Sequence, residues 1–123
     1  MKYIKLSKNM AHTWFIDLDG TILKHNGYIL DKKDSLLTGV IKFFNNIPKR
    51  DKIILTTSRK KNYITKTKKF LQRNKIRFDQ IIYDLPYGER ILINDIKPKN
   101  KLKTAMSINL KRDTGLFKYK ISK

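Results

Sequence analysis

Acidic and hydroxyl side chains follow three short apolar runs of the chain. Asp17 and Asp19 close the run that begins at Thr13, Thr57 follows KIILT, and Asp95 follows ILIN. Carboxylates suit Mg²⁺, which usually takes one or two of them together with phosphate oxygens and water. A carboxylate can also act as a nucleophile or exchange a proton with a reacting oxygen. These residue types could form a Mg²⁺ site, provided that the fold gathers them.

The apolar runs themselves predict buried strands. Residues 13–18 and 52–56 are short and continuous, and an Asp-Gly turn signal follows the first run. Residues 78–83, 91–93 and 105–110 predict three further strands. The triplet of branched residues in the second run is typical of a strand that is covered on both faces.

Helical spacing of apolar residues separates the first three of these strands. It predicts one amphipathic helix over residues 36–44 and another over residues 63–71, with Ser58 as a candidate N-cap of the second. Strands that alternate with helices indicate an α/β, Rossmann-like parallel sheet with helices on both faces. Ligands of such sheets bind at the carboxyl ends of the strands, where the acidic and hydroxyl residues stand.

Composition bounds the remaining possibilities. The 123 residues, 40% of them hydrophobic, predict one domain over residues 1–123. The absence of cysteine excludes disulfides and thiolate zinc sites. Residues 1–10 lack the apolar core of a signal peptide, and no apolar run is long enough to span a bilayer. We therefore expect a cytoplasmic location and no membrane partner.

The formal net charge of +19 has two interpretations. Such a charge attracts phosphate-bearing partners, nucleic acid among them, and speeds their encounter with the protein. The joint abundance of Lys, Asn and Ile is also what the codons of an AT-rich genome produce. The charge alone does not decide between these interpretations.

Three segments together resemble the motifs of haloacid dehalogenase (HAD) superfamily phosphatases. WFIDLDGTIL is similar to the first motif, KIILTTSR to the second, and RILINDIKP to the fourth. An Asp-Gly turn after a strand is common by itself, so the order of all three segments carries the resemblance. It implies a HAD-like hydrolase domain that hydrolyses phosphomonoesters with Mg²⁺ through an aspartyl-phosphate.

The resemblance also implies roles for particular residues. Asp17 would be the nucleophile and a metal ligand. Asp19 would be the general acid and base, with its backbone carbonyl on the metal. Asp95 would be the third metal ligand, while Thr57, rather than Thr56, would bind the phosphoryl group together with Ser58.

The family's third motif, a lysine that balances the charge of nucleophile and phosphate, has no obvious counterpart. Arg90 would stand at the far end of a strand over 91–93, some 16 Å from Asp95 at ~3.3 Å per residue. Lys97, Lys99 and Arg59 lie nearer to the expected site in the sequence. We favour Lys97 as the phosphate-binding cation.

The resemblance further implies a small, capless member, because no segment is long enough for a cap domain. Residues 22–34 predict a hairpin flap with a two-residue turn at Asn26-Gly27. His25 and Tyr28 near its tip, together with Arg59, are candidates for substrate contact, although turn or packing roles would also suit the first two. Residues 114–123 are basic and weakly patterned, and predict a frayed tail.

The substrate can be narrowed only by resemblance. INDIKP and the segment after it are similar to small phosphatases of bacterial capsule or surface-sugar biosynthesis, which implies a phosphorylated sugar or nucleotide-linked small molecule. One alternative is removal of a 3′ or 5′ phosphate from nucleic acid. Another is a non-catalytic basic module that binds nucleic acid on a HAD-like scaffold. Capless members often form homo-oligomers, which complete the site, or act on large substrates.

Overall fold

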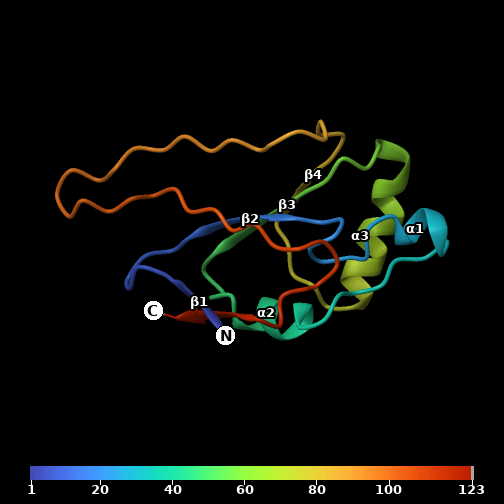
Figure 1. Ribbon diagram of the computed structural model, residues 1–123, viewed down its shortest axis with the longest axis horizontal. Helices are drawn as coiled ribbons and strands as arrows, with labels where there is room; N and C mark the ends of the chain where they lie inside the picture. The colour runs from blue at the N-terminus through green and yellow to red at the C-terminus, as the bar shows by residue number, and fades with distance from the viewer. Residues whose placement is uncertain (123) are drawn as a thin grey trace.

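The computed structural model describes residues 1–122 and shows an α/β fold with two parallel sheets (Figure 1). The larger sheet has the order β2-β3-β4, made by β2 (Thr13–Asp17), β3 (Lys52–Thr56) and β4 (Gln80–Ile82). The smaller sheet pairs β1 (Lys2–Lys5) with β5 (Tyr119–Ser122). The architecture is compatible with a Rossmann-like fold.

Three of the five predicted strands are confirmed, and two are wrong. The runs over 13–18, 52–56 and 78–83 form β2, β3 and β4. Residues 91–93 and 105–110 form no strand. A parallel strand needs a crossover of a dozen or more residues, and only residues 83–90 connect β4 to the fourth run.

Both predicted helices are present, with shifted ends. α2 (Val40–Asn46) begins after Gly39, and α3 (Ile64–Arg73) follows the 3₁₀ turn η1 (Lys61–Tyr63). Ser58 is not the N-cap of α3, because the turn intervenes and Lys60 caps the turn. No helix among residues 1–122 has the length and apolarity to cross a membrane.

The core lies on one face of the larger sheet. Trp14 of β2 meets Phe43 of α2 edge to face, with ring centroids 5.7 Å apart. Leu18, just beyond β2, and Leu55 of β3 are fully buried on this side. Phe15 points the other way and is 55% exposed, so the expected helical cover on both faces is missing at β2.

The segment over residues 22–34 is not the expected hairpin. Asn26 adopts a left-handed conformation with φ 57° and precedes a one-turn helix, α1 (Gly27–Leu30). An isolated antiparallel bridge between Leu23 and Leu36 closes the base of the loop. The helix turn satisfies the backbone locally, where a hairpin would have needed a second strand.

The expected frayed tail is also wrong over its described part. Leu116 is buried and its N–H donates to the Thr38 carbonyl at 2.8 Å, which anchors the segment before β5. Gly115 has φ +77° and lies against the backbone of Thr38, so the tail passes where no side chain would fit. Lys123 lies outside the described residues.

Residues 86–109, which we call the arm, project from the body after β4 (Figure 1). Ile91 and Ile93 are 82% and 89% exposed. The arm doubles back at an isolated antiparallel bridge between Ile96 and Lys103. The apolar run over residues 91–93 is therefore exposed to solvent. In the described chain, the edge of β2 that faces away from β3 has no strand partner.

A buried carboxylate ties the start of β2 to the loop before β3. Asp51 accepts hydrogen bonds from the Trp14 indole N–H at 2.9 Å and the His12 backbone N–H at 2.9 Å, and its carboxylate contacts the His12 ring. Burial opposes ionisation, but these donors together lower the pKa of Asp51 below its ordinary value of 3.8. The ionised carboxylate therefore stabilises the fold.

We expect Asp51→Asn to lower the free energy of unfolding at neutral pH by about 2 kcal/mol, since an amide cannot accept from all these donors. Because the folded-state pKa of Asp51 is lowered, its contribution is complete above pH 3.8 and is lost as pH falls through the folded value. Urea unfolding at pH 7 and pH 3 should show the deficit shrinking in acid. A matched control is Asp31→Asn, which breaks only the exposed pair with Lys24 and should change stability by less than about 0.5 kcal/mol; an equal effect of both variants would contradict the prediction.

Candidate active site

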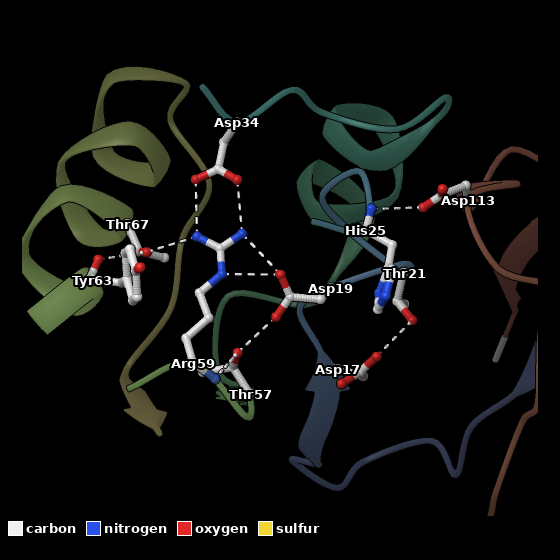
Figure 2. Close-up of polar contacts among 10 residues, drawn as sticks. All are labelled: Asp17, Asp19, Thr21, His25, Asp34, Thr57, Arg59, Tyr63, Thr67 and Asp113. Atoms are coloured by element: carbon white, nitrogen blue, oxygen red, sulfur yellow. Dashed lines mark hydrogen bonds and ion pairs between the residues drawn. The ribbon is translucent and has the colours of Figure 1, made fainter. Parts of the chain in front are cut away.

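Asp17 and Asp19 lie together at the carboxyl end of β2, as predicted (Figure 2). Between them, the Leu18 backbone N–H donates a hydrogen bond to the Thr56 carbonyl of β3 at 2.9 Å. The chain then turns sharply, with Gly20 at φ +86° and its N–H bonded to the Leu23 carbonyl. This turn fixes both carboxylates at one edge of the sheet.

The Asp17 carboxylate is half-buried and has two polar neighbours. The Thr21 hydroxyl donates to Oδ2 at 3.2 Å, and Arg90 Nη1 lies 3.6 Å from Oδ1. Burial raises the pKa of Asp17 above its ordinary value, while Arg90 and then Thr21 oppose the shift. The negative charge of ionised Asp17 is therefore only partly balanced by its neighbours, as that of a metal ligand or nucleophile can be.

Arg90, and not the predicted Lys97, is the cation beside Asp17. A strand over residues 91–93 would have put Arg90 at the wrong end of the sheet. The chain instead leaves β4 at the carboxyl end of that strand, and Arg90 reaches both Asp17 and the Ser58 hydroxyl, the latter at 3.5 Å. Ser58 is thus near the nucleophile candidate, as predicted.

Thr57 is fully buried and contacts Asp19. Its hydroxyl donates to Asp19 Oδ2 at 2.7 Å and accepts from the Arg59 backbone N–H at 3.0 Å. The end of β3 therefore meets the end of β2 through these two side chains, as the predicted parallel sheet requires. In this arrangement the Thr57 proton is engaged by Asp19, so the buried hydroxyl is not offered to a phosphoryl group, contrary to its predicted role.

Arg59 is only 2% exposed, which contradicts its assignment as a substrate contact. Its Nε and Nη2 lie 2.9 and 2.8 Å from Asp19 Oδ1, and its outer nitrogens hold Asp34 in a two-point pair at 2.9 and 2.7 Å. Nη1 also donates to the Thr67 hydroxyl at 2.8 Å. Figure 2 shows the guanidinium enclosed between these groups.

The two flap candidates have structural contacts. The Tyr28 ring covers the Arg59 guanidinium at 3.9 Å and meets Tyr63 edge to face. The pKa of Tyr28 is raised, first by burial and then by the Asp19 charge. His25 is placed by its backbone N–H, which donates to Asp113 at 2.8 Å. These contacts match the packing and turn roles that were the alternatives.

The structure does not bring Asp95 or Lys97 to the aspartate pair. Both are exposed on the arm, with Lys97 Nζ 3.9 Å from Asp95 Oδ1. Accordingly, the described residues contain no group of three acidic or histidine side chains that could hold a metal. The sequence predicted Asp95 at the carboxyl end of the sheet, because it predicted a strand over residues 91–93 that is absent.

The residues that are present still offer Mg²⁺ a partial donor set. Asp17 supplies an accessible carboxylate whose raised pKa reflects incomplete compensation. The Asp19 side chain is taken up by Arg59 and Thr57, so its backbone carbonyl is the donor left from that residue. Mg²⁺ is usually bound through one or two carboxylates together with phosphate oxygens and waters, so a bound phosphate and waters would have to complete this donor set.

Sequence reasoning missed three residues of this site. Thr67 had a usable signal, because it is a polar residue on the buried face of α3 between Ile64 and Leu71. Asp34 had none, since nothing in a loop sequence marks the partner of a buried arginine. Arg90 was missed because the predicted strand over residues 91–93 would have put it at the far end of the sheet.

Comparison with protein-family models, curated proteins and solved structures found no match. Membership of the HAD superfamily therefore remains a prediction from the three motifs.

Proposed function

We propose that this protein is a Mg²⁺-dependent phosphomonoester hydrolase that works through an aspartyl-phosphate on Asp17. The observation that carries the proposal is the pairing at one sheet edge of a half-buried Asp17 with Asp19, whose carboxylate is hydrogen-bonded to the Thr57 hydroxyl. The order of the three motifs supports the same chemistry. A phosphorylated sugar or nucleotide-linked small molecule is the proposed substrate class.

The proposed reaction has two steps. A carboxylate oxygen of Asp17 attacks phosphorus, the bond to the leaving oxygen breaks, and Asp19 gives that oxygen a proton. Asp19 then takes a proton from water, which attacks the phosphorus. The bond between the Asp17 oxygen and phosphorus breaks, inorganic phosphate leaves, and the Asp17 carboxylate is restored. Arg90, 3.6 Å from Asp17, is placed to offset phosphate charge. Bound Mg²⁺ would supply additional charge neutralisation at the phosphoryl oxygens.

The test is phosphate release from sugar phosphates, nucleotides and phosphorylated oligonucleotides, with Mg²⁺ or with EDTA. We expect Mg²⁺-dependent release that falls about 10²-fold in EDTA, because several kcal/mol of charge stabilisation leave with the cation. Readdition of Mg²⁺ should restore the rate. Release that persists unchanged in EDTA would contradict the metal assignment, and no release from any substrate would contradict the hydrolase.

Removal of a 3′ or 5′ phosphate from nucleic acid is the second candidate, favoured by the charge of +19 and by exposed lysines on the arm. The oligonucleotides of the same panel test it directly. Binding through many phosphates weakens steeply as salt rises, whereas a single phosphorylated sugar gives a shallow slope. Tight, salt-sensitive oligonucleotide binding without any release would instead favour a non-catalytic basic module.

A further inference from the structure

The Arg59 guanidinium is buried among polar side chains beside the aspartate pair. Arg59 is 2% exposed, and the Asp34 side chain is 8% exposed. A buried guanidinium is costly unless its donors are satisfied and its charge is balanced. Here Asp34, Asp19 and Thr67 accept its hydrogen bonds, and burial of the cation is offset so that its pKa is raised.

The two aspartates hold the guanidinium in different ways. Asp34 takes both outer nitrogens with both of its oxygens, a geometry that fixes the plane of the guanidinium. Asp19 receives Nε and Nη2 on a single oxygen, Oδ1. The Tyr28 ring lies against the guanidinium at 3.9 Å and limits its movement. Asp34 therefore orients Arg59, and Arg59 in turn orients Asp19.

This arrangement makes the two oxygens of Asp19 unequal. Oδ1 is occupied by two donors from the permanently charged Arg59 guanidinium, so it is held firmly in place. Oδ2 accepts only from the Thr57 hydroxyl among the described hydrogen bonds, and a hydroxyl can rotate away or reverse its role.

We infer that Asp34 and Arg59 are positioning residues that hold the Asp19 carboxylate by Oδ1 and so fix the direction of Oδ2. The inference rests on the proposed phosphatase function. It gives Arg59 a role that does not require contact with substrate. Loss of the clamp should allow the Asp19 carboxylate to turn, and a displacement of about 1 Å at a reacting group can cost about 10²-fold in rate.

The test compares Asp34→Asn with the control Asp31→Asn, which breaks an exposed pair in the same loop. We expect Asp34→Asn to lower kcat about 10²-fold with KM changed less than about threefold, since the clamp does not touch substrate. Asp31→Asn should match the wild type. Thr67→Val, which removes one acceptor of Arg59 and keeps both carboxylates, should show a smaller loss of kcat and serves if Asp34→Asn does not fold.

A second measurement reports the clamp without any turnover. The Arg59 Nε–H, assigned by its loss in Arg59→Lys, should give a slowly exchanging ¹H–¹⁵N signal in the wild type and in Asp31→Asn. Asp34→Asn should move it or speed its exchange. An unchanged signal, or a changed signal with wild-type kcat, would overturn the positioning role alone. No phosphate release by the wild type would overturn the proposed function and the positioning role with it.

Discussion

The Asp17→Asn variant is expected to lose phosphate release by at least about 10³-fold while keeping its fold, because an amide is too weak a nucleophile to replace a carboxylate. The neighbouring Thr21 and Arg90 contacts leave room for an isosteric amide. Initial rates with the best substrate of the panel give the measurement. Asp31→Asn, in the exposed pair with Lys24, is the matched control and should retain full activity.

The same substitution carries a stability signature. Burial raises the pKa of Asp17, so its ionisation costs folding free energy at neutral pH. The cost is absent below the ordinary value of 3.8, grows as pH rises through the folded-state value, and stays constant above it. Asp17→Asn should therefore melt at the same temperature as the wild type or higher at pH 7, without this advantage in acid.

A clear fall in melting temperature at pH 7 would show that Asp17 supports the fold, and loss of activity could then not be assigned to chemistry. Full activity in the variant would remove Asp17 as the nucleophile. Loss of activity together with unchanged or raised stability is the result that the site geometry predicts.

Gly115→Ala should lower the free energy of unfolding by about 3 kcal/mol or more. Its φ of +77° is unfavourable for alanine, and a Cβ would lie 2.2 Å from the Thr38 carbonyl oxygen. Neither backbone can move without breaking the bond from the Leu116 N–H to that oxygen. The substitution should detach the segment that leads into β5 and expose Leu116.

Gly88→Ala is the matched control, because a Cβ there would meet nothing within 4 Å. We expect its effect on stability to be within about 0.5 kcal/mol. Guanidinium unfolding of both variants supplies the comparison. Equal stability of Gly115→Ala and the wild type would mean that residues 114–122 contribute little to the fold, as the basic composition of the tail had suggested.

Local periodicity in the sequence was sufficient to predict the strands of the larger sheet and the helices that pack on it. The continuous runs of β2 and β3 and the apolar spacing of α2 and α3 each encode burial within a few residues. It failed for residues 91–93, where the same kind of run is exposed because the short connection from β4 does not carry it back across the sheet. An apolar run predicts burial only if the chain can reach a partner.

The candidate site was predicted only in part, because its prediction depended on which strands were predicted correctly. Asp17, Asp19 and Thr57 stand at the carboxyl ends of two strands that were predicted and that pair in parallel, so their meeting at one end of the sheet was predictable. Asp95 and Lys97 follow the strand that is absent, and they lie elsewhere. The clamp of Arg59 by Asp34 joins a loop to the end of β3, and no periodicity links those two positions.

The pairing of β1 with β5 has a consequence for the order of folding. It joins residues 2–5 to residues 119–122, so closing it brings together segments that are far apart in the sequence. Such non-local contacts are entropically costly until the intervening chain has ordered. During synthesis, β1 must wait without its partner until residues 119–122 leave the ribosome, although the strands and helices of the larger sheet have by then emerged.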